Sequence, residues 1–273
     1  MKPRLAASVA ALAVVLAGCS SSATPAPTAP APAATAAPAA LTIYGASSLK
    51  SALATMKTTY EAARPGTILT ISTDSSTALE TKIEQGAPVD IFLSADMANP
   101  QKLVDRGLAA GSLVKFAGNL LTVIVPTRNP AGIQTPADLA KTGVKVIAAG
   151  DTVPITKYAS QLVANLAKQP GYPANFVAKY TENIVSKQDN AAAVVAQIEL
   201  GEGDAAIVYL TDAKTSTKVA AIAVPAPANV PATYSGVVVE ASPNAAAANA
   251  FLTWLAGPEG QAILASFGFV PAS

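Results

Sequence analysis

The sequence predicts an α/β fold, because short β-rich segments alternate with segments of helical periodicity from residue 41 onward. The segment LLTVIVP, residues 120–126, is almost continuously apolar, as is typical of a strand buried on both faces of a sheet. No tandem repeat is present. The length of the region favours two lobes over one continuous sheet.

Each expected element follows from its local pattern. Strands are expected where apolar and β-branched residues cluster, at 41–46, 67–73, 89–96, 120–126, 144–150, 204–209, 219–225 and 234–240. Helices are expected where apolar residues recur three or four positions apart and where glycine often ends the run. These helical segments are 49–60, 76–86, 99–107, 135–143, 155–171, 189–203, 244–257 and 258–268.

The first 40 residues are not expected to belong to the fold. Residues 1–18 have a basic start and an apolar run too short to span a bilayer, as in a signal peptide. This run ends in LAGC, which resembles the lipobox of bacterial lipoproteins and implies a lipid on Cys19. From Cys19 to residue 40, proline alternates with small residues, which predicts a disordered tether.

Composition excludes several classes of function. Eighteen basic and seventeen acidic residues give a net charge of +1, so nothing indicates binding to nucleic acid. The chain has no histidine, which removes the usual general base and the commonest metal ligand. We therefore expect neither a Ser-His-Asp triad nor a metal ion bound as a cation, and we expect no cofactor.

Polar residues or proline mark four expected helix starts. They are Ser47 and Ser48, Ser75 and Ser76, Pro154, and Asp189 or Asn190. A helix N-terminus carries unpaired N–H groups and a partial positive charge. Several such ends at one crevice could bind an anion without Lys or Arg. Each is also explained as an ordinary helix cap, and both interpretations stay open at this point.

Several segments resemble one known family. YGASSL, SSTALETKIEQGAPVDIFLSAD, AAGDTVPITKYA, DAAIVYLTDA and FLTWLAGPEGQAILASFGFV are similar to the molybdate-binding proteins of molybdate ABC transporters. The resemblance implies the two-lobed, type II periplasmic-binding-protein fold, in which each lobe is a mixed sheet flanked by helices and the ligand lies in the interlobe cleft. It places lobe 1 at 41–120, lobe 2 at 121–229 and the return to lobe 1 at 230–273.

The resemblance also implies a set of ligand-binding residues. The hydroxyl ligands of the first lobe fall on Ser48 and Ser76, and the tyrosine hydroxyl falls on Tyr209. The backbone donors of the second lobe fall on Ile155 and Ala191. A small residue is common at the position of Ile155 and valine at that of Ala191. These differences matter little if only the N–H groups bind.

The function that the resemblance implies is capture of molybdate, and of tungstate, outside the cytoplasm. The partners are the subunits of an ABC permease and the membrane, through the lipid on Cys19, and we expect a monomer that is not an enzyme. Both oxyanions are fully ionised at neutral pH, so a site of hydroxyl and N–H donors suits them. Sulfate would satisfy the same donors, and monohydrogen phosphate would need an acceptor for its proton.

Two alternatives remain at the level of sequence. The first is a binding protein for another oxyanion, such as sulfate or phosphate, on the same fold. The second is a serine acyl-enzyme, because Ser47 and Lys50 match S-x-x-K and a KTG triplet begins at Lys141. The triplet lies at an expected helix end rather than in a strand, which disfavours the enzyme.

Overall fold

The first sheet forms one lobe of the protein. A computed structural model describes residues 39–272, and its first sheet has the strand order β2-β1-β3-β10-β4. Strands β1, β2 and β3 are parallel, and β10 runs antiparallel to both of its neighbours. The bounds are β1 Ala40–Ala46, β2 Ile68–Asp74, β3 Ile91–Ser94, β4 Val114–Asn119 and β10 Ala232–Val238.

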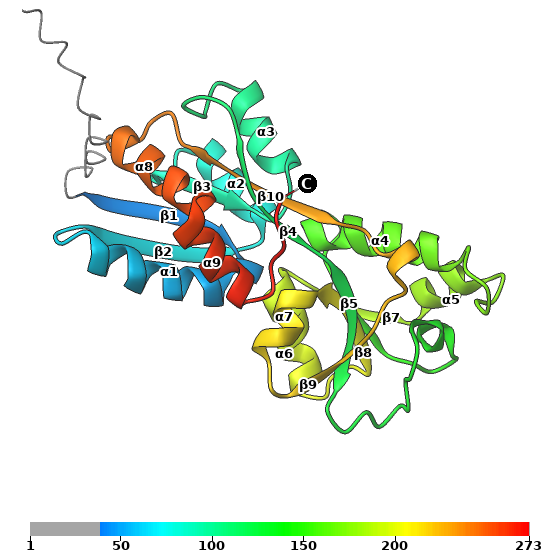
Figure 1. Ribbon diagram of the computed structural model, residues 1–273. Coiled ribbons are helices and arrows are strands. Elements are labelled where there is room, and N and C mark those ends of the chain that lie inside the picture. The colour runs from blue at the N-terminus through cyan, green and yellow to red at the C-terminus, as the bar shows by residue number, and fades with distance from the viewer. Residues whose placement is uncertain (1–38, 273) are drawn as a thin grey trace, which may run out of the picture. The chain divides into compact units, whose positions relative to one another are not determined.

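Helices flank this first sheet (Figure 1). Their bounds are η1 Ser47–Leu49, α1 Lys50–Ala63, α2 Ser76–Glu84, α3 Ala98–Asp105, α8 Ala245–Ala256 and α9 Pro258–Ser266, η1 being a short 3-10 turn. The helices pack against the sheet, and against one another, through apolar side chains. The Tyr60 ring of α1 meets the rings of Phe251 and Trp254 of α8 edge-on, with centroids 5.0 and 4.9 Å away.

The second sheet forms the other lobe and has the strand order β7-β6-β8-β5-β9. Strands β6, β7 and β8 are parallel, whereas β5 runs antiparallel to β8 and β9. The strand bounds are β5 Leu121–Pro126, β6 Val146–Ala149, β7 Ile184–Gln188, β8 Ala205–Tyr209 and β9 Val219–Ile222. The helix bounds are η2 Pro136–Ala140, α4 Pro154–Leu166, α5 Phe176–Glu182, α6 Ala191–Glu199, α7 Leu210–Thr215 and η3 Ala226–Ala228.

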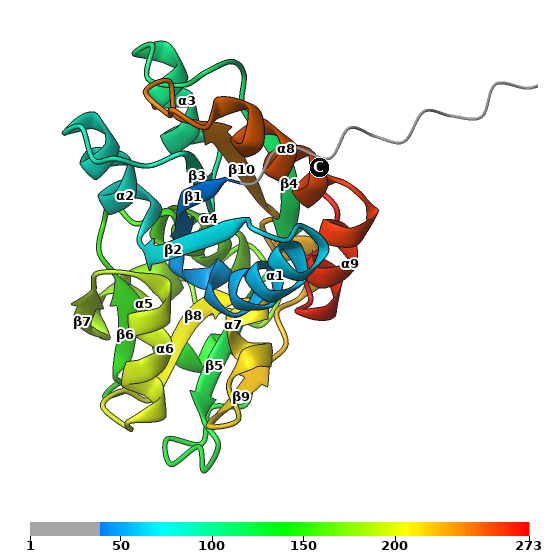
Figure 2. The same cartoon turned by 90° about the vertical axis from the view of Figure 1, so that its left-hand side faces the viewer.

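The chain crosses between the two sheets twice, once between β4 and β5 and once between β9 and β10. Figure 2 shows the two sheets one above the other, with α1 and α7 near the crossing. Strands β1 and β2 lead directly into helices that start at the interface between the lobes, and so do the segments before α4 and α6. This arrangement brings four helix N-termini to one place.

The predicted fold class is confirmed: two mixed sheets are each flanked by helices. Two strands, β4 and β7, and two short α-helices, α5 and α7, escaped the sequence analysis. Strand β4 contains Lys115, Gly118 and Asn119, which weaken its β pattern, and β7 is a half-buried edge strand. The short helices α5 and α7 lie in segments for which no element was expected. The helix expected at 135–143 is a 3-10 turn at Pro136–Ala140, which begins with a capping box between Thr135 and Asp138.

Within residues 39–272, no helix combines the length and apolarity that crossing a membrane requires. The predicted signal peptide, the predicted lipidation site Cys19 and most of the predicted tether lie outside the residues that the structure describes.

Candidate anion-binding site

The five residues predicted to bind the ligand line one small cavity between the two lobes. Ser48 and Ser76 reach it from the first lobe, and Ile155, Ala191 and Tyr209 from the second. The empty space of the cavity is about 200 Å³, compared with about 620 and 1180 Å³ for two other pockets of the protein. This is below the range of about 300–1,000 Å³ that is usual for organic ligands and suits a compact inorganic ion.

Ser48 is not a helix cap. The N-cap position before the first helical turn is held by Ala46, which makes no side-chain cap bond, and Ser47 and Ser48 lie within the turn. The hydroxyl oxygen of Ser48 is 2.8 Å from the Tyr234 hydroxyl, and both residues are buried. The Ser48 hydroxyl is therefore held in place by a side chain rather than used to end a helix.

Ser76 is likewise distinct from the cap of its helix. Ser75 is the N-cap residue of α2, and its hydroxyl oxygen accepts a hydrogen bond of 3.2 Å from the Ala78 N–H. The hydroxyl oxygen of Ser76 accepts one of 3.0 Å from the N–H of Ala95, just after β3. A serine hydroxyl can accept and donate at once, so the hydrogen of Ser76 is available to a ligand in the cavity.

The two predicted backbone donors stand at the starts of α4 and α6. In α6, the Ala192 N–H donates to the Ser47 hydroxyl and the Ala193 N–H to the Asn190 side chain. The N–H of Ala191, the first residue of that helix, has no intrahelical acceptor. Ile155 follows Pro154, the first residue of α4, and its N–H likewise has no intrahelical acceptor. Both N–H groups are thus available at the cavity.

Tyr209 provides the most informative side chain of the site. It is 1% exposed, and its hydroxyl has no hydrogen-bond partner within residues 39–272. Burial raises the pKa of this hydroxyl well above its ordinary value, and Tyr234, Tyr158 and nearby carboxylates raise it further. The group therefore stays protonated. An unpaired buried hydroxyl is costly, which is a physical reason to expect a ligand that accepts its hydrogen.

The sequence analysis missed Tyr234 and Asn119, which orient Ser48. The Asn119 side-chain oxygen accepts a hydrogen bond from the Leu120 N–H, which fixes the orientation of the amide. The Asn119 amide nitrogen then donates hydrogen bonds to the Thr211 hydroxyl, at 2.8 Å, and to the Tyr234 hydroxyl, at 3.3 Å. The Tyr234 hydroxyl can then donate to Ser48, which leaves the Ser48 hydrogen free for a ligand. Asn119 and Tyr234 lie in β4 and β10, far apart in the chain, and no local pattern connects them.

A carboxylate also lines the cavity, and the sequence analysis did not anticipate it. Asp74 accepts hydrogen bonds from the Ser75 N–H at 2.8 Å, from Asn190 at 3.2 Å and from Lys82 at 3.2 Å. Burial alone would raise the pKa of Asp74, but these donors outweigh it and hold the pKa below its ordinary value. Asp74 is therefore charged at neutral pH, and its acceptor sites are largely taken by protein groups.

Another carboxyl, that of the buried Asp212, lies near the tyrosine cluster. Burial raises its pKa to about 7, partly opposed by a hydrogen bond from the Tyr209 N–H. One of its oxygens has no hydrogen-bond partner in the described part of the chain. Asp212 does not line the cavity but raises the pKa of both Tyr209 and Tyr234 through its charge.

The cavity therefore offers hydroxyl and N–H donors but little capacity to accept. No lysine or arginine lines it, and the partial charge of converging helix starts takes their place. Within residues 39–272, no cluster of three or more His, Cys, Asp or Glu side chains could hold a metal ion. Such a donor set can hold a fully deprotonated oxyanion.

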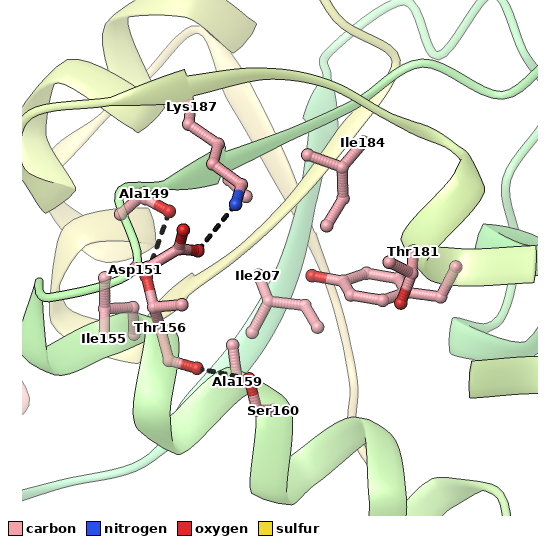
Figure 3. Close-up of a pocket in the computed structure, with 12 residues that line it drawn as sticks. Ala149, Asp151, Ile155, Thr156, Ala159, Ser160, Thr181, Ile184, Lys187 and Ile207 are labelled. Carbon is pink, nitrogen blue, oxygen red and sulfur yellow. Dashed lines mark hydrogen bonds and ion pairs between the residues drawn. The ribbon is translucent and has the colours of Figure 1, made fainter. Parts of the chain in front are cut away.

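A larger pocket in the second lobe is separate from this cavity. Figure 3 shows that it lies beside α4 and β7, with an ion pair of 2.6 Å between Asp151 and Lys187 near Thr156. Its remaining walls are mostly apolar, as at Ile184 and Ile207. Ile155 is the one predicted site residue that also borders this pocket. The pocket therefore does not gather the predicted donors.

Two α/β lobes that enclose a small cavity, with donors from both lobes, define a two-lobed solute-binding protein. Consistent with this class, the chain belongs to the family of bacterial extracellular solute-binding proteins, whose family model matches residues 41–270. The prediction that the chain is not an enzyme is confirmed, because its relatives are solute-binding proteins. The serine acyl-enzyme alternative is thereby excluded.

Individual relatives agree with this assignment. The chain is 27% identical to a molybdate-binding protein of Mycobacterium tuberculosis over 258 residues, 94% of each chain. It matches the structure of the periplasmic molybdate-binding protein of Azotobacter vinelandii with a TM-score of 0.72 and 25% identity, covering 85% of this chain and 100% of that one. The sulfate-binding protein of Mycobacterium tuberculosis matches with a TM-score of 0.76 at 20% identity, over 85% and 86% of the two chains, which bears on the fold alone.

Proposed function

We propose that the protein captures molybdate or tungstate outside the cytoplasm. The observation that carries the proposal is the cavity itself, in which Ser48, Ser76 and Tyr209 can each present a hydroxyl hydrogen and Ile155 and Ala191 an N–H. The similarity to molybdate-binding proteins supports the same ligand.

The lack of a free acceptor narrows the class of anion. Molybdate, tungstate and sulfate have no proton at neutral pH and need only donors. Monohydrogen phosphate must also donate a hydrogen, and the one carboxylate on the cavity wall, Asp74, already accepts from Ser75, Asn190 and Lys82. We therefore expect phosphate to bind much more weakly than the fully deprotonated anions.

Calorimetric titration with molybdate, tungstate, sulfate and phosphate tests the proposal. We expect tight binding of molybdate or tungstate and no measurable heat with phosphate. Tight binding of sulfate with weak binding of molybdate would instead make the protein a sulfate receptor. Binding of none of the four anions would refute an oxyanion site.

The proposal includes delivery of the anion to the permease of an ABC transporter. It also includes a lipid on Cys19 that holds the protein, as a monomer, at the outer side of the membrane. The support for both is the resemblance of LAGC to a lipobox and the family of the chain. Reconstitution of the permease in liposomes, with and without this protein, would test whether anion uptake depends on it.

A further inference from the structure

The carboxylate of Asp74 is unexpected in the wall of a cavity that we assign to a dianion. It lies at the end of β2, next to the cap of α2, with its side chain 30% exposed. A charge in this place repels an anion, and removing it should by electrostatics alone strengthen binding. Its hydrogen bonds, however, indicate a second effect that favours binding.

The partners of Asp74 include a residue of the other lobe. Asp74 Oδ1 accepts from the Ser75 N–H and from the Asn190 amide, which lies in the second lobe, at 2.8 and 3.2 Å. Asn190 is the N-cap residue of α6, and its oxygen accepts from the Ala193 N–H at 3.0 Å. That bond fixes the orientation of the amide, so its N–H₂ faces Asp74. Lys82, at 3.2 Å from Asp74 Oδ2, offsets the negative charge.

Two more hydrogen bonds join the lobes around the same cavity. The Thr77 hydroxyl of α2 donates 2.7 Å to the carbonyl oxygen of Thr152, in the loop before α4. The Ala192 N–H of α6 donates 3.4 Å to the hydroxyl oxygen of Ser47 in the first lobe. All three bonds connect the region of a helix start in one lobe with that of a helix start in the other, so each of them joins the two lobes beside the cavity.

We propose that Asp74 is a positioning residue that fastens the closed cleft through Asn190, so that it strengthens anion binding despite its charge. This inference rests on the proposed function of the cavity. The hydrogen bond to Asn190 forms on closure, and its free energy therefore adds to that of anion binding. The bonds from the Ser75 N–H and from Lys82, both in the first lobe, lower the pKa of Asp74 without help from the second lobe.

The direction in which one substitution changes the affinity for molybdate shows whether Asp74 mainly fastens the cleft or mainly repels the anion. Asp74→Ala removes the charge and the cross-lobe bond together. Fastening predicts about tenfold weaker binding of molybdate, the usual scale for loss of a hydrogen bond to a charged group. Repulsion predicts binding at least as tight as in the wild type. Asp138→Ala is the matched control, because Asp138 also accepts from two backbone N–H groups and a lysine but lies away from the cavity.

A second variant distinguishes the effect of losing the cross-lobe bond from the effect of losing the helix cap. Asn190→Ser keeps a hydroxyl that can cap α6 but loses the amide that reaches Asp74. If the two residues act through one bond, the double variant should bind no more weakly than Asp74→Ala alone. Thr77→Val removes an independent cross-lobe bond and should weaken binding even if Asp74→Ala fails to fold.

The readouts are calorimetric affinity for molybdate and X-ray scattering with and without saturating molybdate. We expect the wild type to contract on binding, and the Asp74→Ala and Asn190→Ser variants to need more molybdate for the same contraction. Wild-type or tighter affinity in Asp74→Ala, with an unchanged melting temperature, would overturn the inference. Failure of the wild type to bind any oxyanion would instead refute the proposed function.

Discussion

The hydroxyl of Tyr209 allows an unusually sharp test of the site. It is buried and has no partner within residues 39–272. Tyr209→Phe therefore removes no hydrogen bond that the protein makes internally, and the apolar ring stays in place against Tyr234, 5.6 Å away between centroids. We expect the protein without ligand to lose no stability, and even to gain if the hydroxyl is poorly hydrated.

The same substitution should strongly affect binding. A hydrogen bond to a charged partner contributes about 1.5–3 kcal/mol. Each 1.4 kcal/mol corresponds to a factor of ten, so molybdate should bind roughly ten- to a hundredfold more weakly. Calorimetric titration gives the affinity, and urea unfolding without molybdate gives the stability. If Tyr209→Phe binds molybdate as tightly as the wild type, Tyr209 is only a core residue and our assignment of the cavity is wrong.

Three further predictions concern other residues. Ser48→Ala and Ser76→Ala should each weaken molybdate roughly ten- to a hundredfold in calorimetry, and wild-type affinity in both would mean that neither serine binds the anion. The pKa of Asp212 is raised from 3.8 to about 7, so its stabilising effect is complete below pH 4 and is lost as the pH rises through 7. In urea unfolding, the free energy of unfolding of Asp212→Asn relative to that of the wild type should rise by about 1.4 kcal/mol per pH unit across this range. Parallel pH profiles of the two proteins would contradict the shift. Cys19→Ala should move the protein from the membrane to the soluble fraction with its melting temperature unchanged, and continued membrane attachment would argue against lipidation.

Local patterns were enough to predict much of the protein. Alternation of apolar strands with periodic helices indicated the α/β class, because burial of one helix face and of whole strands leaves its period in the sequence. The serines after the first two strands and the polar starts of α4 and α6 indicated donors at helix ends, since strand-to-helix junctions are recognisable locally. The resemblance to a family then selected Ser48, Ser76, Ile155, Ala191 and Tyr209, which all line the cavity.

Contacts between distant segments explain what these patterns could not reveal. Whether a serine caps its helix depends on backbone geometry, and here Ser75 caps α2 while Ser76 bonds to the segment after β3. The orientation of Ser48 depends on Tyr234, which is 186 positions away. The bond between Asp74 and Asn190 spans 116 positions and two lobes. Such pairs leave no periodic signal in one sequence, because only the folded chain brings their side chains together.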